Sequence, residues 1–392
     1  MPQELTAKIK LLPTSEQEEL LLKTMAAYRD GCNIASEYAY ESGIYARFEI
    51  QKAVYNDIRE KTGLKAQQAV SVCRTVQARY LSILKNPAFQ KKCRYQGKQL
   101  IPNKVEFRKP QCDLVHNKDY TIKSDQTVTI SVLGDAKRLR IPFEIKGMEK
   151  FFDKNIYKFG TAKLVYIRKN FFLHIGVTKL DVNEVTDEEL FKAHNIVGID
   201  RGINFVVTSY DSNNETVFVS GRRLASYRKH FVELRRSLQK KNTPSSRRRL
   251  KAIGQREHGW MQDVNHCISK ALVEAYPPGT LFVLEDLTGI REEAVKFRKK
   301  RRYVMSSWTY FDLEEKIIYK AKLRHSRVVF LDPRCSSQRC PRCGMVEKSN
   351  RNRKEHLYCC KNCGYRSNDD RVGAINMLQR GEDYLKTLHK PF

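Results

Sequence analysis

Residues 196–202 read Ile-Val-Gly-Ile-Asp-Arg-Gly, an apolar run that ends in the acid Asp200. A second apolar run, residues 281–284, ends in the acid Glu285. Short apolar runs of this kind are typical of buried strands. A carboxylate that directly follows such a strand is poorly hydrated, and it is unfavourable unless a cation lies beside it. The two runs therefore predict neighbouring strands that carry acids at their ends.

Strands and helices alternate around these two runs, which indicates an α/β domain with a mixed sheet. The further strands are expected at 205–210, 216–220 and 327–331, and the helical regions at 224–275 and 311–323.

A third acid, Asp370, lies in residues 367–376, which open a terminal helix. Two strand-end acids and one helix acid can hold two Mg²⁺ ions about 4 Å apart. One ion would activate a water molecule, and the other would stabilise the leaving 3′ oxygen of a phosphodiester. Each acid taken alone is as typical of a non-catalytic role, such as capping a helix or pairing with an arginine, as it is of catalysis. Their joint occurrence in a basic protein favours catalysis.

The first 180 residues predict a different architecture. Residues 4–12 alternate as a strand, and residues 15–85 carry apolar side chains at helical spacing, which indicates a small helical bundle. Thr14 with Gln17, or Ser15 with Glu18, has the spacing of a capping box. Short alternating strands follow, so we expect a β-barrel or sandwich with the helices inserted after its first strand. These strands are expected at 105–107, 120–122, 128–132, 139–143, 162–167 and 172–177, with an acidic linker at 181–189.

Four of the eleven cysteines form two C-x-x-C-G motifs, Cys340/Cys343 and Cys360/Cys363, with sixteen residues between them. This spacing suits one tetrahedral Zn²⁺ bound by four thiolates in a ribbon of two short hairpins. The glycine after each second cysteine fits a tight turn, and this symmetry selects Cys360 over Cys359. Four thiolates leave no open coordination position, so the predicted zinc is structural. The other cysteines are expected to be small buried residues.

The chain has 392 residues, of which 73 are Lys or Arg and 44 are Asp or Glu, so its formal net charge is +29. This charge favours nucleic acid as a partner over an anionic membrane surface. Residues 221–261 hold thirteen Lys or Arg against two Glu, and residues 296–302 read KFRKKRR. A solvated helix face is the alternative for either run, and a nuclear localisation signal for the second. The candidate phosphate-binding residues are Arg247, Arg248, Arg249, Arg298, Lys299, Lys300, Arg301 and Arg302.

No apolar run approaches 18 residues, which argues against a membrane-spanning helix. The first residues, MPQELTAKIK, lack the apolar region of a signal peptide. Eleven cysteines are too few for a disulfide scaffold of this size, so a reducing compartment is favoured. We therefore expect a cytoplasmic, nucleoid-associated bacterial protein with no membrane partner.

The sequence resembles the TnpB proteins of bacterial insertion sequences in five segments that occur in the same order: GIDRGINFVVTS, FVLEDLTG, SSWTYFDLEEKIIYKAKL, CSSQRCPRCG and CGYRSNDDRVGAINML. The resemblance is specific over about residues 195–378 and looser over the N-terminal half. TnpB proteins are RNA-guided DNA endonucleases related to the type V CRISPR effectors. Their catalytic domain is RuvC-like, an RNase H fold, with a zinc ribbon inserted before the last catalytic Asp.

The resemblance implies catalytic roles for Asp200 in the GID motif, for Glu285 as the first acid of ED, and for Asp370 in the last motif. There the family usually has Asn-Ala-Ala where this chain has Val-Gly-Ala at 372–374. The alignment is held by residues 374–376, Ala-Ile-Asn, and it favours Asp370 over Asp369. The departure concerns a supporting hydrogen bond and not the metal ligand.

The resemblance also implies a multidomain α+β architecture. It comprises a wedge-like β-barrel at 1–14 and 100–180, a helical recognition domain at 15–99, a RuvC-like nuclease domain at 190–334 and 366–392, and a zinc ribbon at 335–365. The implied function is an RNA-guided, Mg²⁺-dependent DNA endonuclease that cuts beside a short flanking motif, with guide RNA and double-stranded target DNA as partners. Three alternatives remain open: a nuclease-dead RNA-guided repressor, a conventional transposase and a miniature type V CRISPR effector.

Overall fold

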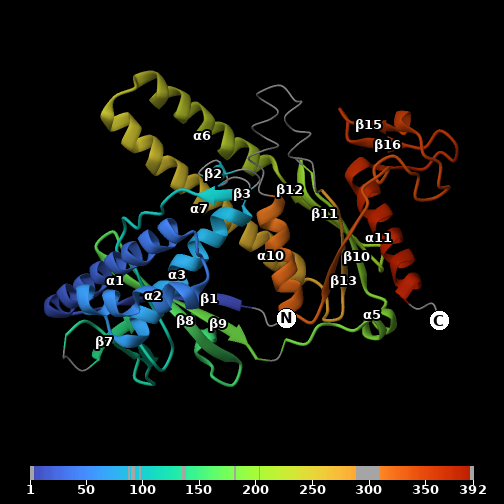
Figure 1. Cartoon of the computed structure of the whole chain (residues 1–392). Coiled ribbons are helices and arrows are strands. Elements are labelled where there is room, and N and C mark those ends of the chain that lie inside the picture. Colours follow the sequence, from blue (N-terminus) through green and yellow to red (C-terminus); the bar gives the residue numbers. More distant parts are fainter. Residues whose placement is uncertain are drawn as a thin grey trace. The chain divides into compact units, whose positions relative to one another are not determined.

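The computed structural model describes residues 4–388, except 87–88, 90–92, 97–98, 135–137, 181, 203 and 288–309. The chain divides after residue 181 into two compact units, coloured along the sequence in Figure 1. Each unit combines helices with a sheet, which confirms the expected α+β multidomain class. Within the described ranges, no helix is long and apolar enough to cross a membrane.

The first unit places three helices after its first strand. The helix α1 begins with a capping box: the Thr14 hydroxyl accepts from the Gln17 N–H at 3.4 Å, and the Thr14 N–H donates to Oε1 of Gln17 at 3.1 Å. Of the two predicted pairs, the structure forms this one. The helix ends at Gly43, whose φ of 69° is left-handed and suits glycine. The helices are α1 (Ser15–Ser42), α2 (Arg47–Thr62) and α3 (Ala66–Lys85).

Seven strands of the first unit form one sheet in the order β4-β8-β9-β1-β7-β6-β5. Its edge strands β4 and β5 follow one another in the chain, and the Tyr120 hydroxyl of β5 donates to the Gly160 carbonyl of β8 at 2.8 Å. The sheet is therefore nearly closed. Its strands are β1 (Glu4–Leu11), β4 (Cys112–Leu114), β5 (Tyr120–Ile122), β6 (Thr127–Ile130), β7 (Leu139–Glu144), β8 (Tyr157–Ile167) and β9 (Asn170–Lys179), while β2 (Cys93–Gln96) and β3 (Gln99–Pro102) form a separate hairpin and η1 (Glu149–Phe152) is a short 3₁₀ turn.

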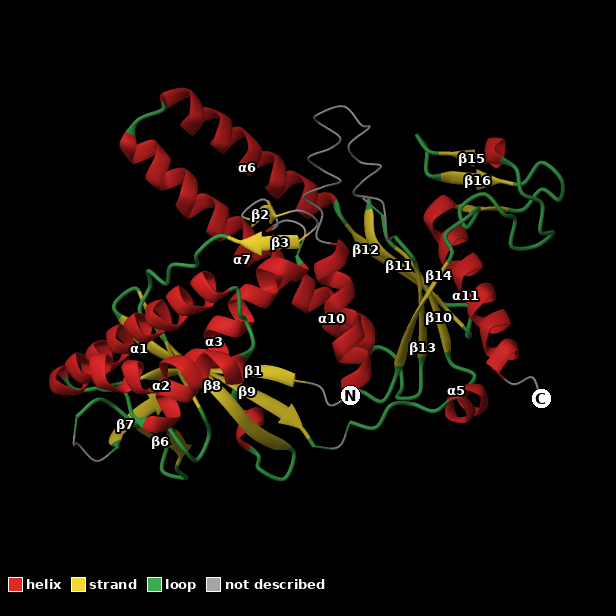
Figure 2. Cartoon of the chain, viewed as in Figure 1, coloured by secondary structure: helices red, strands yellow, loops and turns green. Residues whose placement is uncertain are grey.

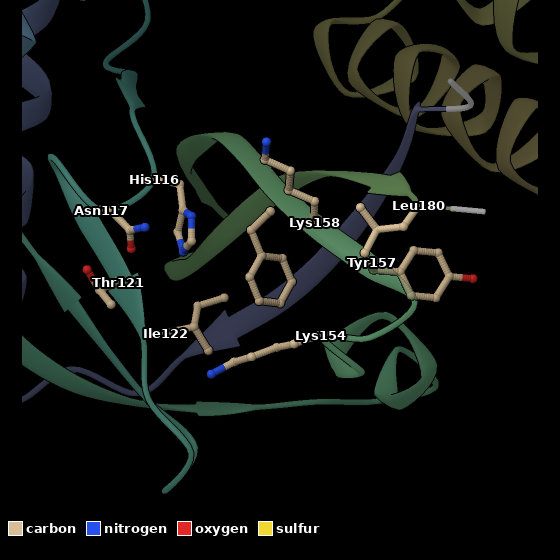
Figure 3. Close-up of a pocket in the computed structure, with 9 residues that line it drawn as sticks. His116, Asn117, Thr121, Ile122, Lys154, Tyr157, Lys158 and Leu180 are labelled. Carbon is tan, nitrogen blue, oxygen red and sulfur yellow. The ribbon is translucent and has the colours of Figure 1, made fainter. Parts of the chain in front are cut away.

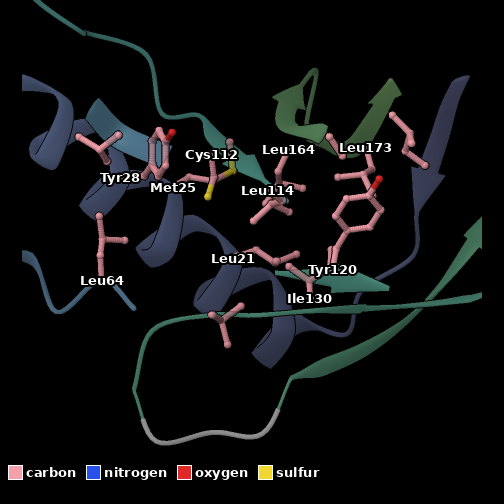
Figure 4. Close-up of a cluster of buried hydrophobic side chains, with 14 of the residues drawn as sticks. Leu21, Met25, Tyr28, Leu64, Cys112, Leu114, Tyr120, Ile130, Leu164 and Leu173 are labelled. Carbon is pink, nitrogen blue, oxygen red and sulfur yellow. The ribbon is translucent and has the colours of Figure 1, made fainter. Parts of the chain in front are cut away.

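The helices and this sheet share one hydrophobic core (Figure 4). Leu21, Met25 and Tyr28 recur at helical spacing along α1, and all three are fully buried. They lie in the same cluster as Leu114 and Leu173, which come from the strands. Each such buried side chain contributes about 1.5–3 kcal/mol, so this shared burial holds the helices on the sheet.

The prediction of a strand at residues 105–107 is wrong, because this segment is irregular. The Phe107 N–H donates to Oδ1 of Asn33 at 2.8 Å, and the Val105 N–H donates to the Tyr80 hydroxyl at 3.2 Å. Side chains of α1 and α3 therefore satisfy the backbone groups that a neighbouring strand would otherwise bind.

The second unit is built on a five-stranded mixed sheet in the order β12-β11-β10-β13-β14 (Figure 2). The pairs β10–β13 and β13–β14 are parallel, and the pairs β10–β11 and β11–β12 are antiparallel. The predicted mixed sheet is thus confirmed. Its strands are β10 (Ile196–Asp200), β11 (Phe205–Asp211), β12 (Thr216–Ser220), β13 (Leu281–Glu285) and β14 (Arg327–Leu331).

Helices cover both faces of this sheet. One face packs against α6, α7 and α10, and the other packs against α5 and α11. The linker predicted at 181–189 is only partly irregular, because α5 begins inside it with a capping box of Thr186 and Glu189. Cys267 on α7 is exposed, which corrects the expectation that it is buried. The helices are α5 (Asp187–Ala193), α6 (Arg222–Lys241), α7 (Pro244–Glu274), α10 (Tyr310–Leu323) and α11 (Asp369–Leu388).

A small three-stranded antiparallel sheet precedes α11. It contains β15 (Arg351–Asn352), β16 (Leu357–Cys359) and β17 (Arg366–Asn368), with the short turn η2 (Lys348–Asn350) before it.

Candidate active site and metal centre

The ends of β10 and β13 bring Asp200 and Glu285 to one face of the five-stranded sheet. The strands are parallel and Ile199 pairs with Leu284, so the next residue of each strand is an acid. Side chains alternate between the faces of a strand. Leu284 packs with α7 and α10, whereas Val283 packs with α11, so Glu285 points to the α11 face. The same alternation along β10 places Asp200 on that face.

The helix α11 brings Asp370 to the same place. It approaches β10 closely because Gly198 has no side chain: a Cβ there would lie 2.1 Å from the Ala374 carbonyl oxygen. Likewise, a Cβ on Gly373 would lie 3.0 Å from Cγ of Asp200. Gly373 stands where the motif departs from the usual Asn-Ala-Ala, and the short distance to Asp200 gives this glycine a packing reason.

Burial acts on all three acids, which we call the carboxylate cluster (Asp200, Glu285 and Asp370), and nearby acids add repulsion at Asp200 and Asp370. Burial, then the charges of Glu285 and Asp370, raise the pKa of Asp200 well above its usual range, although the residue keeps some exposed surface. Burial likewise raises the pKa of Glu285, which is 9% exposed, and of Asp370, which is 7% exposed.

A bound cation would offset this repulsion, and carboxylates are the donor type that a hard cation prefers, but the three acids do not converge on one point. All three acids are among the described residues, and no choice of one oxygen from each brings the three within 4.8 Å of one another.

Asp369, the neighbour of Asp370, is committed to other partners. It is fully buried, Nε of Arg351 donates to its Oδ2 at 2.8 Å, and Nδ1 of His356 lies 3.3 Å from its Oδ1. The second arm of Arg351 reaches Asp370, with Nη2 3.5 Å from Oδ1. Asp369 thus has two ion-pair partners and Asp370 has one, and ligand atoms of His356, Asp369 and Asp370 lie within 4.8 Å of one another.

Arg201 ties the carboxyl ends of the two strands together. Its side chain is fully buried, and its Nη2 donates to the Glu285 carbonyl oxygen at 2.6 Å. Its Nη1 donates to Oε2 of Glu314 on α10 at 2.7 Å. The arginine therefore fixes the backbone from which the Glu285 side chain leaves, and its charge opposes the rise in the pKa of Glu285.

The four cysteines of the two motifs come together in what we call the cysteine cluster (Cys340, Cys343, Cys360 and Cys363). Their sulfurs all lie within 4.8 Å of one another, and the pairs Cys340–Cys363 and Cys343–Cys360 are each 3.6 Å apart. Tetrahedral bonds of about 2.3 Å to one Zn²⁺ would separate the sulfurs by about 3.8 Å. The cluster therefore fits a tetrahedral metal ion, and Cys359 is not part of it.

The surrounding backbone prepares the cysteine cluster for a metal. The Met345 N–H and the Asn362 side-chain amide lower the pKa of Cys343 to about 6, which favours its thiolate, while burial and the other three thiols raise the pKa of Cys363 to about 12. Gly344 and Gly364 have φ values of 75° and 70°, so both predicted tight turns are present.

The sequence that forms this site is similar to known proteins. Residues 310–377 match the family model "Cas12f1-like, TNB domain". A TnpB-like protein of Methanocaldococcus jannaschii is 30% identical over 189 residues, which cover 47% of this chain and 67% of that protein. The chain belongs to the TnpB family.

Other relatives of this TnpB protein are named CRISPR-associated endodeoxyribonucleases. The CRISPR-associated endodeoxyribonuclease Cas12f1 of Sulfoacidibacillus thermotolerans is 31% identical over 196 residues, or 46% of this chain and 44% of that protein. The matched segments span less than half the length of this Cas12f1 and of a second one from Syntrophomonas palmitatica. The solved Cas12f1–sgRNA–target DNA complex is similar in fold, with a TM-score of 0.63 at 13% identity over 96% of this chain and 98% of that one.

The predicted basic residues of the TnpB protein divide into two groups. Arg247, Arg248 and Arg249 are exposed on α7, and Nε of Arg247 donates to Oδ1 of Asn242 at 3.2 Å. The other predicted contacts, Arg298, Lys299, Lys300, Arg301 and Arg302, lie outside the described residues.

The first unit of the TnpB protein contains an open pocket of about 390 Å³ (Figure 3). His116 and Phe159 line it and contact each other edge to face, with ring centroids 5.6 Å apart. Lys154 and Lys158 supply the positive charge of its lining, which contains no acid. The pocket therefore offers aromatic surface beside positive charge.

Sequence reasoning missed several residues of the site. Arg201 directly follows a strand-end acid, and that position was the available signal for a buried partner. Arg351, His356 and Ser336 carry no such signal, because their partners lie 18, 13 and 51 residues further along or back in the chain.

Proposed function

We propose that this protein is an RNA-guided, Mg²⁺-dependent DNA endonuclease, encoded with an insertion sequence, that cuts target DNA beside a short flanking motif. The carboxylate cluster carries the proposal. Three acids from separate segments face one side of one sheet, and burial raises the pKa of each. Such acids are the donor set of two-metal phosphodiester hydrolysis. The relatives support the substrate class, since one is named an endodeoxyribonuclease and a fold neighbour was solved with sgRNA and target DNA.

The architecture supports a finer assignment. We assign residues 190–334 and 366–392 to a RuvC-like nuclease domain of the RNase H fold, and residues 335–365 to a zinc ribbon inserted in it. Residues 1–14 and 100–180 would form a wedge-like barrel, with residues 15–99 as its helical recognition insert. The mixed sheet with helices on both faces supports the first assignment, and the nearly closed sheet supports the third.

The two donor sets call for different metals. Carboxylate oxygens suit the hard cation Mg²⁺, which would bind Asp200, Glu285 and Asp370, and four thiolates suit one Zn²⁺ at the cysteine cluster. Bound there, Mg²⁺ would supply water activation and stabilisation of the leaving oxygen.

The chain's own residues prepare the site for this chemistry. Arg201 fixes the ends of β10 and β13 so that the acids of the two strands stay side by side. Arg351 places a positive charge beside Asp370 and is itself oriented by buried Asp369. A phosphodiester bound at the cluster would bring negative oxygens near this charge, so Arg351 would be suited to orient the scissile phosphate.

The surface of the α6–α7 hairpin supports a polyanionic partner. The helix α7 has no acid in its first turn, and Arg247, Arg248 and Arg249 follow close to its positive end. Positive charges near a helix N-terminus are unfavourable alone, and phosphates would offset that repulsion. The pocket of the first unit offers a second place for nucleic acid, where a base would contact His116 and Phe159 while Lys154 or Lys158 contacts a phosphate. With RNA and genomic DNA as partners, the protein would act at the nucleoid.

One alternative has specific support. The similarity to Cas12f1 favours a miniature type V CRISPR effector, which would use the same site with a guide from a CRISPR array. A nuclease-dead repressor is disfavoured, because all three acids are present on one face.

The deciding experiment purifies the full chain from a host that carries its gene with flanking DNA, and sequences the RNA bound to it. A plasmid library that matches this guide beside randomised flanks is then incubated with the complex and Mg²⁺. We expect linear product from plasmids with one flanking motif, and none with EDTA or with the matched Asp200→Ala complex. Binding without cutting in Mg²⁺ would indicate a repressor. Binding of transposon ends without RNA would indicate a conventional transposase.

A further inference from the structure

The loop between β14 and the first cysteine motif reaches the carboxylate cluster. On this loop Ser336 is 4% exposed, and its hydroxyl donates to Oε1 of Glu285 at 2.5 Å. This short bond joins a segment beside the cysteine cluster to an acid at the end of β13. The bond fixes the position of Oε1 and therefore the plane of the Glu285 carboxylate.

Three side chains of α11 hold this loop in place. Asn376, Gln379 and Arg380 are three and four residues apart, so they lie on one face of the helix. Asn376 Nδ2 donates to the Ser336 carbonyl at 2.5 Å and to the Arg339 carbonyl at 2.9 Å. Gln379 Nε2 donates to the Pro341 carbonyl at 3.1 Å, and Arg380 donates to the Arg334 carbonyl, two residues before Ser336. The helix therefore fixes the loop on both sides of Ser336.

The backbone beside Ser336 is strained. Cys335 has a φ of 62°, a left-handed conformation that is unfavourable for a residue with a side chain. The turn is closed by the Ser336 N–H, which donates to the Pro333 carbonyl at 3.1 Å. A strained backbone conformation persists only when the surrounding contacts hold it in place. Here the held turn presents the Ser336 hydroxyl to the Glu285 carboxylate.

We propose that Ser336 is a positioning residue of the carboxylate cluster, which orients the Glu285 carboxylate for the cation while α11 fixes the loop that carries it. The inference rests on the proposed function only for its consequence in cleavage, because orientation of Glu285 is a property of the protein alone. The helix α11 would then control two acids of the cluster: it carries Asp370 directly, and it sets Glu285 through Ser336.

The test compares Mn²⁺ binding by four full-length chains without RNA: the parent, Ser336→Ala, Ser336→Thr and the matched control Ser337→Ala. Ser337 lies on the same loop and is partly exposed. Free Mn²⁺ is measured by electron paramagnetic resonance, and an Asp200→Ala chain defines the share bound by the carboxylate cluster. Loss of an orienting hydrogen bond should weaken that binding about tenfold in Ser336→Ala. Ser336→Thr, which keeps the hydroxyl, should stay within about twofold of the parent.

The outcomes separate positioning from a purely structural role. Parental Mn²⁺ affinity in Ser336→Ala, or an equal loss in Ser336→Ala and Ser336→Thr, overturns the proposal. A zinc content in Ser336→Ala below the parent's also overturns it, because the residue would then support the cysteine cluster instead of Glu285. Target cleavage by the parent complex is scored separately. A parent that binds Mn²⁺ at the cluster but never cuts its guided target contradicts the proposed function and leaves the role of Ser336 standing.

Discussion

The cysteine cluster and the carboxylate cluster are both suited to metal, but they are assembled in opposite ways. All four thiols lie within residues 340–363, and their sulfurs already stand at distances that suit one ion. The three acids come from positions as far apart as 200 and 370, and burial raises the pKa of each, with added repulsion from nearby acids at Asp200 and Asp370. The first site is preformed by a local motif. The second is formed by topology, and arginines and a serine around it hold the repelling groups together.

The largest effect is expected from a variant that removes an acid of the carboxylate cluster. In Asp200→Ala, cleavage of a guided target should fall by roughly three orders of magnitude or more. Binding of guide and target should persist, because the basic surface is unchanged. The folded-state pKa of Asp200 lies above its ordinary value, so at neutral pH this carboxyl group destabilises the metal-free fold. The variant's melting temperature without metal should therefore hold or rise. Single-turnover cleavage, filter binding and thermal melting measure the three quantities.

A metal exchange provides the matching control on the unmodified protein. Ca²⁺ should support target binding but not cutting, because its longer and more flexible coordination suits the water-activating geometry poorly. Parental cutting rates in Asp200→Ala would contradict the endonuclease assignment.

The second-largest effect is expected from a variant that removes a thiol of the cysteine cluster. Cys343→Ser should reduce the zinc content from about one ion per chain to none, since the four thiolates bind one ion together. Binding energy of such sites is folding energy, so amide exchange across residues 340–363 should accelerate. Cys359→Ser is the matched control, and it should keep the metal because its sulfur lies outside the cluster. Loss of zinc in Cys359→Ser with retention in Cys360→Ser would show that the ligand assignment is shifted by one residue.

The same contrast explains what the sequence predicts well. The cysteine ligands follow from two local motifs, and the strands β10 and β13 follow from apolar runs that end in an acid. The sequence also predicts that these two strands are neighbours. In their parallel register Ile199 pairs with Leu284, and an acid directly follows each of these two residues. The strand expected at residues 105–107 failed because Asn33 and Tyr80, more than twenty residues away in the chain, satisfy its backbone. Arg351 and Ser336 were missed for the same reason, since each acts on an acid supplied by another segment, whereas Arg201 had a signal in its position after a strand-end acid.

A third variant tests the link between the two clusters. Arg351 belongs to the segment between the cysteine motifs, and buried Asp369 pairs with it. Asp369→Asn keeps the shape but removes the charge, so the free energy of unfolding should fall by about 3 kcal/mol. Cleavage should fall less than in Asp370→Asn, which removes a cluster acid. Denaturant melts and single-turnover rates report the two effects. If Asp369→Asn abolishes cutting and Asp370→Asn cuts normally, the alignment of the last motif is displaced by one residue.

The smallest expected effect leaves both clusters intact and changes only the surface. Replacing Arg247, Arg248 and Arg249 together by Gln should weaken guide or target binding roughly tenfold, equally for all sequences, because phosphate contacts do not read bases. The plot of log affinity against log salt should flatten by about one unit per lost contact. Zinc content and the cutting rate at saturating target should match the parent, since these arginines are exposed on α7 and touch neither cluster. A triple Lys variant keeps the charge and should restore most of the slope. An unchanged slope in the Gln variant would identify this part of α7 as a solvated helix face.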